Sequence, residues 1–280
     1  MDMPKPVDPS TTISRYVSFA TFLSIVRTRK MYFPAAGTFS DKHEGSGTVI
    51  DEMHLDGLFD ALHALVNYRM TASLGIGVTP ERRETLKAEA EAIEKRRRTI
   101  QTPFGALDVT PERKYRQILA ALRLSLDVSC WHENIDESLA MWKIYGGSAE
   151  SVCIRSTVGA LDSALQLEPD ARKVVARVKY IDHQQDWFED GHAFSSVTHK
   201  QKPYSFEQEV RAIVWNPGSD PFEPRAATGS LVDIDLHKLV TSIRLSPEAQ
   251  PWFRALVAGV VADDLKVEIE QSIISRDPIL

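Results

Sequence analysis

The late segment Ser205-Phe206-Glu207-Gln208-Glu209-Val210-Arg211-Ala212-Ile213-Val214-Trp215 decides the fold, because it holds a strong strand pattern together with charges that indicate a cleft. Successive side chains of a strand point to opposite faces. One face therefore carries Phe206, Gln208, Val210, Ala212 and Val214, and the other carries Glu207, Glu209, Arg211, Ile213 and Trp215. The second face begins charged and ends apolar. This pattern predicts a strand whose first half lines a cleft and whose second half enters the core.

Short strands and helices surround this segment without a regular strand–helix alternation. Hydrophobic periodicity predicts further strands at residues 13–17, 30–34, 126–131, 151–155, 173–181, 231–234, 243–245 and 267–274. The same criterion predicts helices at residues 20–29, 50–70, 79–98, 110–123, 137–145, 158–165 and 247–261. This mixture favours an α+β fold over a doubly wound parallel sheet.

The length of 280 residues is near the upper limit for one hydrophobic core. We therefore expect a single α+β domain over residues 13–280, with a helical insertion at residues 50–123 and a loose N-terminal tail at residues 1–12. The helix expected at residues 79–98 ends in the basic run Lys95-Arg96-Arg97-Arg98. Such a run suits the negative end of a helix dipole, and a patch that binds a partner is the alternative.

Composition excludes several classes of protein. A formal net charge of −6 argues against bulk attraction to nucleic acid, and two cysteines are too few for a disulfide framework. The N-terminus has no apolar signal core and no run reaches membrane-spanning length, so we expect a cytoplasmic protein without membrane contact. The acidic and histidine residues near positions 41–44 and 182–192 fit no defined metal site, so no metal is expected. Phosphate-loop and dinucleotide glycine motifs are also missing from the sequence.

Four segments together resemble a bacterial family catalogued as domain of unknown function 2971. They are Arg15-Tyr16 with Met31-Tyr32-Phe33-Pro34, then the loop Thr38-Phe39-Ser40-Asp41-Lys42-His43-Glu44-Gly45, then Val128-Ser129-Cys130-Trp131 continuing through Met141-Trp142-Lys143-Ile144-Tyr145, and last Lys202-Pro203-Tyr204-Ser205-Phe206-Glu207-Gln208-Glu209-Val210-Arg211. Their order and spacing agree with the family over most of residues 13–275. In the loop, Ser40, Lys42 and His43 stand where the family shows Asn, Pro and Phe.

The layout is also similar to that of mono-ADP-ribosyltransferases. Those enzymes place an Arg or His on an early strand, aromatic residues near nicotinamide and a catalytic Glu within Glu-x-Glu on a late strand. The resemblance implies a mainly antiparallel sheet core, NAD as substrate and Glu209 as the catalytic carboxylate, assisted by Glu207. It further implies NAD contacts from Arg15, Tyr16, Trp142, Tyr145 and Arg211. The acceptor, whether protein or nucleic acid, stays open.

These residue types suit the cleavage of NAD at its glycosidic bond. A carboxylate stabilises the positive charge that develops on the ribose, and a second carboxylate can deprotonate the acceptor. An arginine can bind the pyrophosphate through charge-assisted hydrogen bonds, and an aromatic ring can stack on nicotinamide. We therefore expect an ADP-ribosyltransferase-like enzyme, in the role of a bacterial toxin or phage-defence effector.

Structural interpretations remain open for the same residues. Glu207, Glu209 and Arg211 also fit an ion-pair ladder on an exposed strand, and Trp142 and Tyr145 fit core packing at helical spacing. The alternative function is a non-catalytic module that binds a nucleotide or a partner in a bacterial defence or stress system. In that case the charged helix at residues 81–98 would contact the partner.

Overall fold

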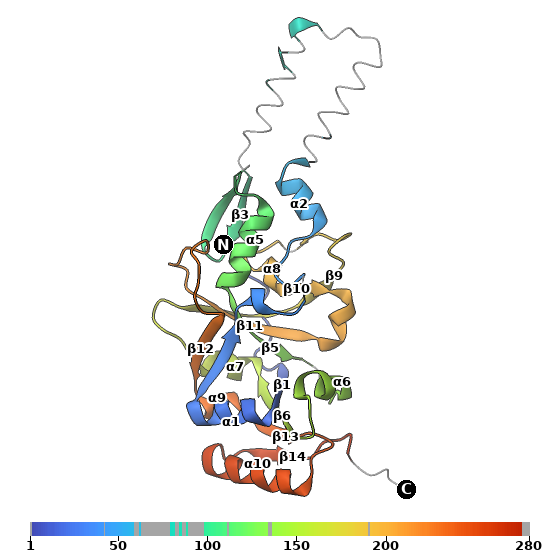
Figure 1. Cartoon of the computed structure of the whole chain (residues 1–280), viewed down its shortest axis with the longest axis vertical. Helices are drawn as coiled ribbons and strands as arrows, with labels where there is room; N and C mark the ends of the chain where they lie inside the picture. The colour runs from blue at the N-terminus through green and yellow to red at the C-terminus, as the bar shows by residue number, and fades with distance from the viewer. Residues whose placement is uncertain are drawn as a thin grey trace.

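A mainly antiparallel sheet lies at the centre of the fold (Figure 1). The computed structural model describes residues 2–41, 43–58, 98–110, 112–133, 136–189 and 191–275, with positions 62, 79–81, 84, 85 and 88. Within this part, seven strands pair in the order β14-β13-β6-β1-β5-β11-β8. All neighbours are antiparallel except β13 and β14. The strands are β1 (Thr12–Ser18), β5 (Asp127–His132), β6 (Ser151–Thr157), β8 (Arg172–Arg177), β11 (Glu209–Trp215), β13 (Ser242–Leu245) and β14 (Glu268–Glu270).

Three smaller sheets accompany the central one in the part of the chain that the structure describes. The first has the order β2-β12-β7, the second pairs β9 with β10 in parallel, and the third is the hairpin β3–β4. Their bounds are β2 (Lys30–Pro34), β3 (Arg98–Thr102), β4 (Gly105–Val109), β7 (Leu165–Gln166), β9 (Lys179–Ile181), β10 (His199–Gln201) and β12 (Gly229–Ile234). The single strand expected at residues 173–181 is thus two strands, β8 and β9. The mixed α+β class with a mainly antiparallel sheet is confirmed.

Helices cover the sheet and occupy its connections. The longest helices in the described ranges are α1 (Phe19–Thr28), α5 (Tyr115–Ser125) and α10 (Pro251–Asp264). The shorter ones are η1 (Ala36–Thr38), α2 (Val49–Leu55), α6 (Leu139–Met141), η2 (Trp142–Gly146), α7 (Val158–Ala164), α8 (Ser195–Thr198), η3 (Lys202–Glu207) and α9 (Leu236–Leu239). No helix in the described ranges is long and apolar enough to cross a membrane.

Strand β11 is buried along its whole length and connects two hydrophobic clusters. Val210, Ala212 and Val214 belong to the main core, which also contains Phe22 and Trp131. On the other face, Ile213 and Trp215 pack into a second cluster that contains Phe194. The alternation predicted for this strand is therefore confirmed from position 209 onward, and its apolar end enters the core as expected.

The start of that strand differs from the prediction. Residues Lys202–Glu207 form the 3₁₀ helix η3 with Pro203 in its first turn, and Gln208 follows with a positive φ of 43°. Proline fixes φ near the helical value and removes an N–H that a sheet would need, so it favours a helical turn over a strand here. Glu207 consequently lies at the end of a turn, and only Glu209 lies on the strand.

The helical insertion expected at residues 50–123 contains a β-hairpin as well as helices. Its described parts are α2, the hairpin β3–β4 and α5, which begins at Tyr115 instead of at residue 110. Most of the helix expected at residues 79–98, including Lys95, Arg96 and Arg97, lies outside the described residues. Arg98 is the first residue of β3. The prediction of a partner for this basic run therefore stays a prediction.

The N-terminal segment is attached to the domain by several contacts. Val7 is buried in the main core, and the carbonyl of Pro9 accepts a hydrogen bond from the N–H of Gly159 at 2.9 Å. The carbonyl of Asp2 accepts another from the N–H of Ala193 at 3.1 Å. These contacts precede β1, which lies in the middle of the sheet, so the segment expected to be a loose tail leads directly into the core.

Candidate functional site

A cavity of about 530 Å³ opens where β1, β5 and β11 lie side by side. Ligand pockets commonly have volumes of about 300–1,000 Å³. Strand β1 contributes Arg15 and Tyr16, β5 contributes Cys130 and His132, and β11 contributes Glu209. The opposite walls come from η2, β10 and η3 through the residues Tyr145, Lys200 and Glu207. Five of the site residues predicted from sequence thus meet in one cavity, namely Arg15, Tyr16, Tyr145, Glu207 and Glu209.

Glu207 and Glu209 form a buried carboxyl pair that shares one ammonium group. Nζ of Lys200 lies 2.6 Å from Oε2 of Glu207 and 2.6 Å from Oε1 of Glu209. All three side chains are buried, with exposed fractions of 8% or less. Because Glu207 ends η3 and Glu209 begins β11, the tight turn at Gln208 brings the two carboxyl groups together. The strand alternation assumed from the sequence is not what aligns them.

Their surroundings give the two carboxyl groups opposite pKa shifts. Burial and a hydrogen bond with Glu209 raise the pKa of Glu207 to about 7, while Lys200 opposes this rise. Burial also disfavours ionisation of Glu209, but Arg211 and Lys200 together outweigh it and hold the pKa of that carboxyl well below its ordinary value. The pair therefore combines a permanently ionised carboxylate with one that can exchange a proton near neutral pH.

Arg211 binds Glu209 of this pair and does not line the cavity. Its guanidinium has no exposed surface, and its Nε donates to Oε2 of Glu209 at 2.6 Å. Nη1 and Nη2 both bind the carboxylate of Glu44, and Nη1 also donates to the carbonyl of Val197 at 2.8 Å. With its donors directed to these groups, Arg211 is placed to fix the carboxylate of Glu209. The NAD contact expected for Arg211 is not supported by this geometry.

Arg15 lies on the cavity wall without a carboxylate partner among the residues that the structure describes. Its Nη1 contacts the hydroxyl of Ser129 and, at 3.2 Å, the sulfur of Met31. Both partners are uncharged, and burial lowers the pKa of Arg15. Burying a guanidinium without a counter-ion is costly. The position therefore suits a negatively charged group from a ligand.

The three aromatic residues expected at the site have different positions. Tyr145 is 38% exposed, lines the cavity and donates its hydroxyl to Oε1 of Glu207 at 2.8 Å. Tyr16 also lines the cavity, but its ring is almost fully buried. Trp142 packs edge-on against Tyr16 with a centroid distance of 4.8 Å, and its Nε1 donates to Glu137. Trp142 lies outside this cavity, so the prediction that it contacts NAD is not supported.

The separation of Trp142 from Tyr145 follows from the local backbone. Residues Trp142–Gly146 form a π-helix in which the N–H of Gly147 donates to the carbonyl of Trp142, five positions earlier. This wider turn rotates side chains relative to an ordinary helix and is frequent at functional sites. The ordinary helical spacing assumed from the sequence would have kept the two rings together.

Two cavity residues, His132 and Lys200, were not identified from the sequence. Nδ1 of His132 lies 2.9 Å from the main-chain carbonyl of Glu207. A carbonyl only accepts hydrogen bonds, so Nδ1 carries the proton and Nε2 remains an acceptor. Burial lowers the pKa of His132 to about 4, which keeps the ring neutral near pH 7. Alternation along β5 pairs His132 with Cys130, a signal that could have placed both on the cavity face.

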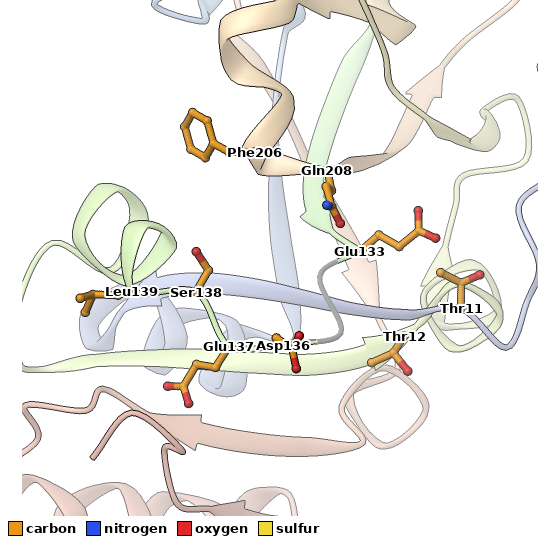
Figure 2. A pocket seen from close by; sticks show the side chains of 9 residues that line it. All are labelled: Thr11, Thr12, Glu133, Asp136, Glu137, Ser138, Leu139, Phe206 and Gln208. Atoms are coloured by element: carbon orange, nitrogen blue, oxygen red, sulfur yellow. The ribbon is translucent and has the colours of Figure 1, made fainter. Parts of the chain in front are cut away.

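A second, more polar cavity of about 840 Å³ lies beside the first. Phe206 lines both cavities. Figure 2 shows Phe206 and Gln208 on one side of the second cavity and Asp136 and Glu137 on the other. Glu137 is already bound by Trp142, and Glu133 by Arg177. In the described ranges, no group of three or more His, Cys, Asp or Glu residues is arranged to hold a metal ion.

Comparisons with known proteins give a similar solved structure but no family. No protein-family model and no curated protein matches the chain. Its resemblance to domain of unknown function 2971 therefore rests on the quoted segments alone. Among solved structures, the chain is similar to DarT from Thermus sp. 2.9 in complex with ADP-ribosylated ssDNA. The TM-score is 0.37 and the identity 8%, over 98% of each chain.

Proposed function

We propose that this protein binds NAD in the cavity between β1, β5 and β11, cleaves its glycosidic bond and transfers ADP-ribose to an acceptor. One observation carries the proposal. A half-buried arginine with no carboxylate partner among the described residues, an exposed tyrosine ring and two carboxyl groups with opposite pKa shifts line the same cavity. These are the groups that an anionic dinucleotide with a cleavable ribose bond requires. The acceptor is not assigned.

Arg15 is the group that would bind the pyrophosphate of NAD. A phosphate oxygen accepts charge-assisted hydrogen bonds from a guanidinium, and it also supplies the counter-ion that Arg15 lacks. Lys200 cannot take this role in the observed arrangement, because its ammonium is bound to Glu207 and Glu209. The anionic part of the ligand is therefore expected at the β1 wall, which leaves the ribose and nicotinamide for the opposite wall.

The carboxyl pair would act on the ribose. When the bond between C1′ of the ribose and the nicotinamide nitrogen breaks, its electron pair leaves with nicotinamide and positive charge develops on the ribose. The ionised carboxylate of Glu209 stabilises that charge. An acceptor nucleophile then forms a bond to C1′ and releases its proton to Glu207, whose pKa of about 7 suits a proton acceptor near neutral pH.

Tyr145 offers a surface for the nicotinamide ring. Its ring is partly exposed at the cavity while its hydroxyl is held by Glu207, so the orientation of the ring is fixed before a ligand enters. A fixed aromatic face can stack on a flat heterocycle. Tyr16 of β1 lines the same cavity with an almost fully buried ring.

Calorimetric titration with NAD and chromatographic assay of released nicotinamide test this proposal. We expect wild-type protein to bind NAD and release nicotinamide, and Arg15→Met to weaken binding by at least about tenfold. Arg27→Met is the matched control, because Arg27 is an exposed arginine of α1 that pairs with Asp264. If the wild-type protein produces no binding heat with millimolar NAD, the proposal is wrong.

A further inference from the structure

Lys200 occupies the centre of the carboxyl pair. It lies in β10, and the parallel pairing of β10 with β9 sets it opposite Tyr180. Its ammonium also lies 4.6 Å from the centre of the Tyr204 ring. Donors from the protein reach every oxygen of the pair: Tyr145 and Lys200 bind Glu207, and Lys200 and Arg211 bind Glu209. Lys200 is the donor that contacts both carboxyl groups.

We propose that Lys200 is the positioning residue of this site, which joins Glu207 and Glu209 into one unit and thereby allows Glu207 to give up its proton to solvent near neutral pH. This inference rests on the proposed function, because it assigns Lys200 a role in the same reaction. Lys200 acts through the two carboxyl groups and is not assigned a contact with NAD.

The physical reason is the repulsion between two buried carboxylates that share one ammonium group. Two negative charges at such a distance disfavour each other, and one of the groups then keeps its proton to higher pH. The Lys200 ammonium between them offsets this repulsion and opposes the rise in the pKa of Glu207. Without it, burial and Glu209 would act unopposed, and Glu207 would stay protonated well above pH 7. A protonated Glu207 cannot accept the proton of the acceptor.

Other charged and titratable groups surround Glu207 as well. They are Arg15 of β1, Asp41 and Glu44 of the loop between η1 and α2, Cys130 and His132 of β5, Tyr145 of η2, Tyr180 of β9, Tyr204 of η3, and Glu209 and Arg211 of β11. Burial raises the pKa values of Cys130, Tyr145 and Tyr180 and lowers that of His132 to about 4. These four groups therefore keep their neutral forms between about pH 5 and 9, where Glu207 titrates.

Nicotinamide release measured against pH distinguishes this role from a merely structural one. In the wild-type protein we expect the rate to rise with pH through a midpoint near 7, set by Glu207. In Lys200→Met the midpoint moves up by at least one pH unit, so the rate at pH 7 falls at least about fivefold while the plateau at high pH stays nearer to the wild-type value. Lys200→Arg keeps the charge and the wild-type midpoint. Lys202→Met, at an exposed lysine paired with Asp186, is the matched control.

A second measurement separates failure of this inference from failure of the proposed function. Carbon-13 NMR of the Glu side-chain carboxyls, assigned with Glu207→Gln, follows the ionisation of Glu207 without any turnover. A Glu207 midpoint that is equal in wild type and Lys200→Met overturns the role of Lys200, whatever the catalytic result. If the Glu207 midpoint is shifted in Lys200→Met but the wild-type protein releases no nicotinamide, Lys200 controls the ionisation of Glu207 and the proposed function is wrong. If Lys200→Met fails to fold, Lys200→Gln, which keeps a hydrogen-bond donor, replaces it in both measurements.

Discussion

The hydroxyl of Tyr145 donates a hydrogen bond to Oε1 of Glu207 at 2.8 Å, although 62 positions separate the two residues in the chain. This bond connects η2 to η3 across the cavity. Burial and the neighbouring carboxyl group raise the pKa of Tyr145, so its hydroxyl keeps its proton and remains a donor. The same residue therefore offers its ring to the cavity and its hydroxyl to the carboxyl pair.

Tyr145→Phe should separate these two roles. The substitution keeps the ring and removes a hydrogen bond to a carboxyl group, an interaction worth about 1.5–3 kcal/mol. We expect nicotinamide release to fall about tenfold or more, with little change in NAD affinity. Tyr32→Phe is the control, since the hydroxyl of the exposed Tyr32 lies 3.0 Å from that of Thr228 and does not line the cavity. An unchanged rate in Tyr145→Phe would show that this hydrogen bond does not serve the reaction.

Glu209→Gln should abolish turnover without removing the fold. The amide has nearly the same shape as the carboxylate but no charge to stabilise the ribose cation, so we expect a loss of at least about 100-fold in the rate of nicotinamide release. NAD binding, measured by calorimetry, should persist because Arg15 is untouched. Glu248→Gln, at an exposed carboxylate paired with Lys143, serves as the comparison. Near-wild-type turnover in Glu209→Gln would exclude Glu209 as the catalytic carboxylate.

Arg211→Met should destabilise the protein strongly. It leaves the buried carboxylates of Glu44 and Glu209 without their common partner, a change that typically costs about 3–5 kcal/mol. The folded-state pKa of Glu209 lies below its unfolded value, so its contribution to stability is present above the unfolded pKa and is lost as pH falls through the folded one. The variant lacks this contribution.

Urea denaturation at pH 7 and pH 4 measures the effect of Arg211→Met. We expect the difference in unfolding free energy between wild type and variant to be largest at pH 7. It should narrow at pH 4, because the carboxyl group of Glu209, no longer held ionised by Arg211, can then take up a proton. A difference that is small at pH 7, or that widens at pH 4, would contradict the role given to this ion-pair cluster.

Glu207→Gln should change how stability depends on pH in the opposite sense. The folded-state pKa of Glu207 is about 7, above its unfolded value, so the folded wild-type protein holds a proton that the unfolded chain has already lost between about pH 4 and 7. Stability from this group is therefore present at low pH and declines as pH rises through 7. Glutamine has no such dependence.

The measurement for Glu207→Gln is urea denaturation at pH 5 and pH 8. Relative to wild type, the variant should gain unfolding free energy between the two pH values, even if it is less stable at both. A constant difference across this interval would mean that Glu207 ionises with an ordinary pKa. That result would also remove the reason to assign it the proton of the acceptor.

Sequence reasoning selected several of the residues that line this cavity. Arg15, Tyr145, Glu207 and Glu209 were selected by residue type and order, and the structure brings them to one cavity. Arg211 and Trp142 were selected by the same reasoning, but neither lines the cavity. Both are buried, and they bind Glu209 and Glu137 respectively. His132 and Lys200 carry no local motif, so only their neighbours in space reveal them.

The sequence by itself determined the α+β class, most of the strands and helices, and the buried alternation along β11, because these follow from local periodicity and from the opposite faces of a strand. The tertiary structure alone decided which cation meets which carboxylate. Such pairing depends on the turn at Gln208, the π-helix at Trp142–Gly146 and the contact between β9 and β10, which join residues distant in the chain. Ionisation follows distance and burial in three dimensions, and neither quantity is written in the spacing of residues along the chain.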